Sequence, residues 1–187
     1  MSTAGPRRAD ALKNRERLVA EADALFASDG GPVTLDMIAK AAGVGIGTLY
    51  RHFPTRESLV EAVYRLELDA LDRRADALLA TSTASDAMRH WLDDYLHFVA
   101  TKHAMQDALR VGITPRDNAA STIRLRINAV VGRFLSAGGA DGTLRDDVSP
   151  DDVTLGLLGM ALAANAASQV DQTRRMLGLL LAGLKQH

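Results

Sequence analysis

The stretch TLDMIAKAAGVGIGTLYRHFPTRESLVEAVY, residues 34–64, decides the fold of this chain. It predicts two short helices, at 35–42 and about 46–53, separated by a turn at Gly43. Thr34 can cap the first helix, and Gly43 can end it because glycine adopts a positive φ at little cost. Two short helices joined by such a turn are typical of a helix-turn-helix.

The outer side of the second short helix carries small and polar residues that suit contact with DNA. A helix with small residues at its start can approach base edges in the major groove, and Gly47 lets the backbone come close. Thr48 offers a hydroxyl and a methyl group to a base, while nearby hydrogen-bond donors suit the phosphates. The residues that we expect to bind DNA are Thr34, Gly45, Ile46, Gly47, Thr48, Tyr50, Arg51, His52 and Arg56.

The rest of the chain also reads as helices, so the predicted fold class is all-α with about nine helices. Strand-forming clusters are nearly missing, and aromatic residues make up only 4% of the 187 residues. The predicted helices span about 8–28, 35–42, 46–53, 55–80, 86–102, 104–111, 116–136, 150–167 and 172–185. We expect a DNA-binding domain at 8–55 and a sensing and dimerisation domain at 56–187. Arg7 and Arg8 are expected on an arm before the first helix, where they either enter the minor groove or contact nothing.

Composition narrows the possible functions further. The chain has no cysteine, which excludes disulfides and thiolate metal sites and fits a reducing cytoplasm. We find no signal peptide and no apolar stretch long enough to cross a bilayer, so the expected location is cytoplasmic. The net charge is −1, with a slight basic excess in residues 1–56 that would not by itself indicate DNA binding. No catalytic or nucleotide-binding motif is present, and we expect neither enzymatic activity nor a cofactor.

The string A-x-x-A-G-V-x-x-G-x-L-Y-x-H-F-x-x-[KR]-E-x-L resembles the signature of tetracycline-repressor (TetR) family regulators. It is matched by Ala39, Ala42, Gly43, Val44, Gly47, Leu49, Tyr50, His52, Phe53, Arg56, Glu57 and Leu59. The resemblance covers roughly residues 8–65 and rests beyond them on helix number and length. Two positions depart from the usual residues: Gly45, commonly serine, lacks a hydroxyl, and Arg56, commonly lysine, keeps the charge with a different geometry.

The resemblance implies a C-terminal domain that senses a small molecule. Trp91, Tyr95 and Phe98 share one side of a helix and either line its cavity or pack in an ordinary core. With Met105 and Leu109 from the following apolar segment, they form the predicted ligand site. Few charged residues lie near this stripe, so an apolar ligand is expected.

The resemblance also implies that the last two helices form a four-helix dimer interface. Both helices carry strongly apolar faces, which can equally pack inside one chain. The leucines assigned to dimerisation are Leu155, Leu158, Leu162, Leu177, Leu180, Leu181 and Leu184.

The leading hypothesis is a homodimeric, ligand-responsive repressor whose partners are palindromic double-stranded operator DNA and a small molecule. A second hypothesis is a helical scaffold that does not bind DNA. The third is a metal-dependent enzyme built on His90, Asp94 and His97, which share a helix face but are more often simply solvated. No metal site is therefore assigned.

Overall fold

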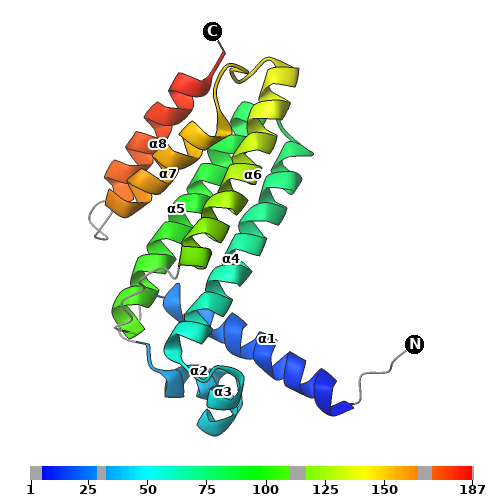
Figure 1. Cartoon of the computed structure of the whole chain (residues 1–187), viewed down its shortest axis with the longest axis vertical. Coiled ribbons are helices and arrows are strands. Elements are labelled where there is room, and N and C mark those ends of the chain that lie inside the picture. Colours follow the sequence, from blue (N-terminus) through cyan, green and yellow to red (C-terminus); the bar gives the residue numbers. More distant parts are fainter. Residues whose placement is uncertain (1–5, 29–32, 110–116, 164–169, 187) are drawn as a thin grey trace. The chain divides into compact units, whose positions relative to one another are not determined.

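The structure is a computed structural model that describes residues 6–28, 33–109, 117–163 and 170–186, without the side chains of 6–8, 101–109, 117–121 and 163. This part of the chain forms eight α-helices and no strand, which confirms the all-α prediction (Figure 1). The helices are α1 (Pro6–Phe26), α2 (Leu35–Ala41), α3 (Ile46–His52), α4 (Arg56–Leu79), α5 (Ala84–Leu109), α6 (Asp117–Asp141), α7 (Pro150–Ala163) and α8 (Val170–Leu184).

The described helices are one fewer than the approximate nine that the sequence predicts. The segment predicted at 86–102 and the described part of the one predicted at 104–111 lie in one helix, α5, because no glycine or proline stands between them to interrupt it. α6 also continues to Asp141, beyond its predicted end at residue 136. Arg7 and Arg8 lie within α1 rather than on an arm before it.

The chain divides into two compact units, Met1–Leu66 with Ala104–Ile113, and Glu67–His103 with Thr114–His187. In the first unit α1 packs against α2 and α3. Its core is made of apolar side chains at helical spacing, which include Leu18, Ala22, Phe26, Ile38, Leu49, Phe53, Leu59 and Val63. The first turns of α4 belong to this unit, so the helix-turn-helix has its own hydrophobic support.

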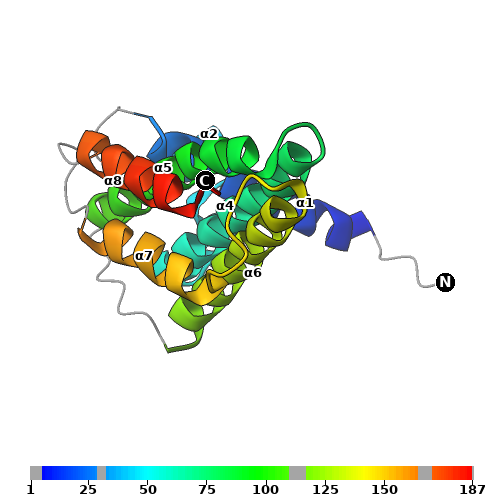
Figure 2. The same ribbon diagram turned by 90° about the horizontal axis from the view of Figure 1, so that it is seen from above.

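The second unit contains the rest of α4 and most of α5, together with α6, α7 and α8. α7 packs against both α6 and α8, and Figures 1 and 2 show α7 and α8 side by side. The largest fully buried side chains of the second unit are Trp91, Phe134, Met88, Ile127 and Leu144. Aromatic and branched side chains thus fill the centre of this helical unit, as a stable core requires.

Ion pairs tie α4 to its neighbours within the second unit. Arg126 on α6 lies 2.7 Å from the Asp69 carboxylate on α4. Arg133, two turns further along α6, donates to Asp72, and this hydrogen bond is the main cause that lowers the pKa of the Asp72 carboxyl. The second half of α4 is therefore fixed to α6 by paired charges as well as by packing.

Candidate nucleic-acid interface

The first helix of the helix-turn-helix begins at a capped end. Thr34 has extended backbone angles, φ −112° and ψ 157°, and its Oγ1 accepts a hydrogen bond of 3.2 Å from the Met37 backbone N–H. A side-chain acceptor at this position satisfies one of the free amides of the first turn. The predicted cap is confirmed, and the Thr34 hydroxyl hydrogen remains available for an outward hydrogen bond.

The turn between α2 and α3 depends on Gly43. Its φ is +64°, in the left-handed region where glycine has no steric penalty. The amide of Gly43 donates to the Lys40 carbonyl, and the next amide, of Val44, donates to the Ala39 carbonyl; both bonds are 3.0 Å long. These bonds end α2 and lead the chain into α3 after a short turn, as the sequence predicts.

The inner side of α3 holds it in place. Leu49 is fully buried, and Phe53, which follows the last residue of α3, is almost so. The guanidinium of Arg15 on α1 lies 5.0 Å from the centre of the Phe53 ring, within the range of a cation–π interaction. α3 is therefore seated firmly enough to present its outer side in a fixed orientation.

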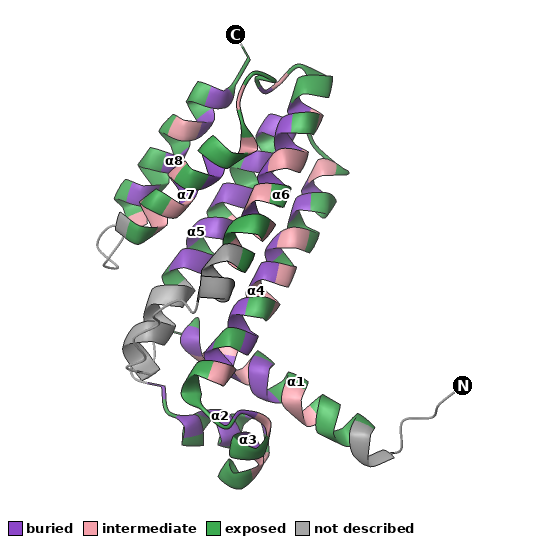
Figure 3. Ribbon diagram, in the orientation of Figure 1, coloured by how far each residue is buried: buried purple, intermediate pink, exposed green. Residues whose placement is uncertain are grey.

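The outer side of α3 is open. Ile46, Gly47, Tyr50 and Arg51 are exposed, and Thr48 and His52 are half-buried (Figure 3). A Cβ added to Gly47, or to Gly45 just before the helix, would meet no atom within 4 Å. Neither glycine is needed for internal packing, and Gly45 has an ordinary φ of −73°. Glycine costs a helix about 0.5–1 kcal/mol relative to alanine, so room for an external partner explains Gly47 better than folding does.

The start of α4 is capped reciprocally next to Arg56. The Ser58 amide donates to Thr55 Oγ1 at 3.1 Å, and the Thr55 amide donates to Ser58 Oγ at 3.4 Å. Thr55 therefore caps α4, close to the start that the sequence predicts for this helix. Arg56 is exposed in the first turn of α4.

Three of the predicted ligand residues, Trp91, Tyr95 and Phe98, occupy the core of the second unit. The Trp91 indole donates to the Leu71 carbonyl at 3.0 Å, and the Tyr95 hydroxyl donates to the Leu157 carbonyl at 3.1 Å. The Trp91 and Tyr95 rings stack at 5.6 Å, and Phe98 is buried beside Tyr95. Burial raises the pKa of the Tyr95 hydroxyl, so it stays protonated and donates.

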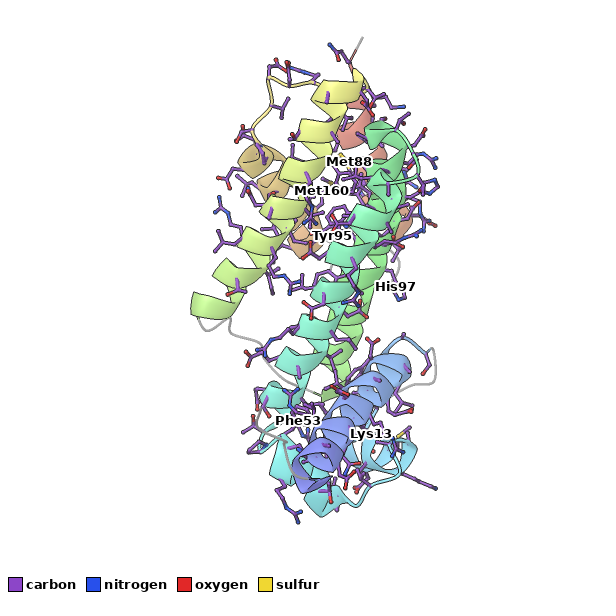
Figure 4. The ribbon with its side chains drawn as sticks, turned by 90° about the vertical axis from the view of Figure 1, so that its right-hand side faces the viewer. Lys13, Phe53, Met88, Tyr95, His97 and Met160 are labelled. Atoms are coloured by element: carbon purple, nitrogen blue, oxygen red, sulfur yellow. The ribbon has the colours of Figure 1, made fainter. Side chains whose placement is uncertain are left out.

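Figure 4 shows Tyr95 in the interior of this unit near Met88, and His97 at its edge. Met105 and Leu109, the other two predicted ligand residues, lie outside the side chains that the structure describes.

Two members of the His90, Asp94 and His97 set, His90 and Asp94, are held in other contacts. Asp94 accepts a hydrogen bond of 3.1 Å from Arg74 on α4, and the His90 ring lies 3.1 Å from the Arg89 guanidinium. Within the residues that the structure describes, no group of three or more histidine, cysteine or acidic side chains could hold a metal ion.

Two of the predicted dimer leucines are exposed on α7, Leu155 at 61% and Leu162 at 72%. Leu158 and Leu180 are half-buried, whereas Leu177, Leu181 and Leu184 belong to the chain's own core. The last three are packed inside this chain, so little of their surface is left to cover a partner.

Two residues that the sequence analysis missed are exposed on α8, Met176 at 46% and Leu179 at 69%. The sequence shows that α8 is apolar, but its leucines surround the helix too widely to tell the inner side from the outer one. We call Leu155, Leu162, Met176 and Leu179 the α7/α8 apolar surface.

Two family models match the chain. The model described as "Bacterial regulatory proteins, tetR family" matches residues 18–63, and "Transcriptional regulator SbtR-like, C-terminal domain" matches residues 83–186. A TetR transcriptional regulator from Streptomyces coelicolor has a similar crystal structure, with 35% identity and a TM-score of 0.73 over 92% of this chain and 98% of that one. A TetR regulatory protein from Mycobacterium vanbaalenii also has a similar crystal structure, with 32% identity and a TM-score of 0.70. The similarity covers 96% of this chain and 99% of that one.

Curated relatives match over the N-terminal region. An HTH-type transcriptional regulator of Staphylococcus aureus strain USA300 is 41% identical over 63 residues, which are 33% of this chain and 34% of that protein. The match thus spans about a third of the length of these relatives. In the described part of the chain, no helix has the length and apolar character needed to cross a membrane.

Proposed function

Because the chain belongs to the TetR family of transcriptional regulators, we propose that it is a ligand-responsive repressor that binds a palindromic operator as a homodimer. The observation that carries this proposal is the open outer side of α3. Gly45 and Gly47 leave room there that the fold does not use, beside the half-buried Thr48 and the exposed Tyr50 and Arg51. An α-helix with such a face fits the major groove, where small residues let the backbone approach base edges.

Five side chains on or near α3 have a proposed role. Thr48 lies on the first turns of α3 and would read a base through its hydroxyl or methyl group. Tyr50, His52 and Arg56 would bind phosphates and so fix the register of α3 in the groove. Thr34 would donate its remaining hydroxyl hydrogen to a phosphate at the start of α2.

Selection of random duplex DNA on the purified protein tests the proposal directly. A homodimer with two recognition helices should select a palindrome whose half-sites are separated by about one helical turn. Enrichment of no sequence, with no binding even at low salt, would instead support a helical scaffold that does not bind DNA.

Substituting Gly47 with alanine should change stability and DNA affinity in opposite directions. The added methyl meets no protein atom, and alanine in place of glycine inside a helix stabilises the fold by about 0.5–1 kcal/mol. The same methyl would hold α3 away from the groove, so operator affinity should fall about tenfold, or roughly 1.4 kcal/mol. Thermal unfolding and a gel shift measure the two effects.

The matched control for Gly47→Ala is Gly132→Ala on α6, outside the α7/α8 apolar surface. A Cβ on Gly132 would make only ordinary contact, 3.7 Å from Pro150 Cγ, so it should give a similar helix gain. Its operator affinity should stay unchanged. Unchanged affinity in Gly47→Ala as well would show that the α3 backbone does not approach DNA closely.

The second unit is the proposed sensor. Among the described residues, the buried polar side chains are Ser85, Thr154 and Thr173, and no charged side chain is buried. The Thr154 hydroxyl is buried without a hydrogen-bond partner, so it could serve a polar group of a ligand. Together with Trp91 and Tyr95, this interior favours a small, uncharged, mainly apolar ligand.

Ligand binding to the second unit can be followed by the fluorescence of Trp91, the single tryptophan of the chain. We expect an uncharged aromatic compound that binds the second unit to change the emission of Trp91 and to weaken operator binding by about 5–150-fold. Operator DNA must then weaken binding of that compound by the same factor, because the two equilibria are linked. Titrations with and without the other partner measure both factors. Factors of one for a tightly bound compound would mean that its binding is not coupled to DNA.

A further inference from the structure

One arginine outside the predicted DNA-binding set lies against the helix-turn-helix. Arg17 on α1 is exposed, yet its guanidinium is folded onto the turn between α2 and α3. A Cβ built on Gly43 would lie only 2.9 Å from Nη2 of Arg17 and 4.0 Å from its Cζ. The guanidinium therefore occupies the room that a side chain at position 43 would need.

Arg17 has no carboxylate partner within the described part of the chain. Among the described residues, no acidic oxygen forms an ion pair with it, whereas exposed arginines of the second unit such as Arg74 and Arg124 are paired. A paired arginine would have much of its charge neutralised before any partner arrived. Arg17 instead keeps a full positive charge beside the turn that leads into α3.

The position of this charge relative to α3 suggests its use. The turn ends at Gly45, which caps α3, and the open positions Gly45 and Gly47 follow directly. A helix that enters the major groove has a phosphate backbone along each side of its first turns. A guanidinium presents five donors in a rigid fork that matches two phosphate oxygens, which a lysine cannot reproduce.

We propose that Arg17 binds a DNA backbone phosphate beside the start of α3. Because Gly43 has no side chain, the Arg17 guanidinium can lie against the turn at this position. This inference rests on the proposed DNA-binding function. It gives Gly43 a second role, because its missing side chain both permits the φ of +64° and makes room for Arg17. The contact positions the protein on duplex DNA and reads no base.

The salt dependence of binding tests the contact without knowledge of the operator. A fluorescein-labelled duplex of random sequence is titrated with wild-type protein and with Arg17→Gln over a range of KCl concentrations. Loss of one phosphate contact should make the slope of log K against log salt shallower by about 0.9 for each bound protomer. Affinity at low salt should fall about tenfold, as expected for a charge-assisted hydrogen bond.

Two further variants separate this role from general effects. Arg73→Gln removes an exposed arginine from α4 in the second unit and should leave the slope unchanged. Arg17→Lys keeps the charge without the fork, so it should retain the slope while recovering only part of the affinity. A structural role for Arg17 would lower thermal stability without changing the slope, and this result would overturn the proposal.

The placement of the Arg17 guanidinium against Gly43 is tested by combining substitutions. Gly43→Ala introduces backbone strain in any background, but it displaces the guanidinium only when Arg17 is present. The salt-dependence slope of Gly43→Ala should therefore match that of Arg17→Gln. The double variant should have the same slope as either single variant. If the decreases in slope from the two substitutions add together, the proposed placement of the Arg17 guanidinium against Gly43 is wrong.

The same titrations separate the two levels of inference. Wild-type protein that binds no duplex at low salt would overturn the proposed function and this inference together. Wild-type binding with an unchanged slope and affinity in Arg17→Gln would overturn the Arg17 contact alone.

Discussion

A glutamate in place of Leu162 is expected to leave the protein folded but monomeric. Leu162 is 72% exposed on α7 and is one of the four residues of the α7/α8 apolar surface. If two copies of this surface pack together, the added carboxylate is buried without a partner, which costs several kcal/mol. Sedimentation equilibrium should show monomers at concentrations at which the wild type is dimeric.

The same variant should bind its operator far more weakly. A dimer holds two recognition helices on one palindrome, so each half-site is bound at the high effective concentration that the other provides. A monomer loses this gain, and operator affinity should fall by at least about a hundredfold. A gel shift with the selected operator measures this loss.

Two other leucines provide the controls for Leu162→Glu. Leu125 on α6 is 70% exposed, nearly the same as Leu162, but lies outside the α7/α8 apolar surface, so Leu125→Glu should remain dimeric. Leu177 is buried inside the chain, and Leu177→Glu should unfold it instead. A Leu162→Glu protein that stays dimeric with full operator affinity would place the interface elsewhere.

Local signals explain why the helix-turn-helix could be predicted from the sequence. The cap at Thr34, the positive φ at Gly43 and the cap at Thr55 each depend on residues within three positions of one another. Such features are determined by side-chain chemistry and backbone sterics, which the sequence states directly. The close approach of Arg17 to Gly43 was missed because Arg17 lies on α1, and the turn at Gly43 is more than twenty residues further along the chain.

Features of the second unit depend on packing and were predicted less well. The leucines of α8 looked equivalent, yet Leu181 is buried while Leu179 is 69% exposed. Only the position of α8 against its neighbours decides which side faces inward. The aromatic stripe was identified, but the sequence could not show that Trp91 and Tyr95 donate to the backbone carbonyls of Leu71 and Leu157.

The glycines near the end of α6 show the same limit. The sequence predicts a loop from residue 137, since two adjacent glycines favour the end of a helix. The helix instead continues through both to Asp141. A Cβ on Gly138 would lie 2.4 Å from Cβ of Leu144, so glycine is required here by close packing rather than by a turn.

The segment that packs on Gly138 joins three helices of the second unit. The Gly138 carbonyl accepts from the Leu144 amide at 3.2 Å, so the chain folds directly back over the end of α6. The Asp141 carboxylate accepts from the Ala84 amide at the start of α5, at 2.8 Å. The Arg145 amide donates to the carbonyl of Leu184, at the end of α8, at 2.9 Å. A shift of this segment would therefore disturb several helix ends together.

Replacing Gly138 with alanine is thus expected to destabilise the second unit strongly. Leu144 is fully buried, and ordinary contact at about 3.4 Å would require its Cβ to move by about 1.0 Å and its Cγ by about 0.8 Å. Its side chain cannot make these shifts without a shift of its backbone. Overpacking of this kind costs about 1–3 kcal/mol and, with the helix ends tied to the segment, we expect the upper part of that range. Urea unfolding followed by helical circular dichroism measures the loss.

Neighbouring substitutions show whether the Leu144 contact is the cause. Gly139→Ala, whose Cβ would lie 3.3 Å from Asp146 Cβ on the exposed side of α6, should cost less than Gly138→Ala. Leu144→Ala removes Cγ and Cδ1 and leaves a cavity, into which the new methyl of Gly138→Ala can partly fit. The double variant should therefore lose less stability than the two single losses added together, because contacting residues couple. Strict additivity, or a Gly138→Ala protein as stable as the wild type, would mean that the segment shifts easily and does not fix the helix ends.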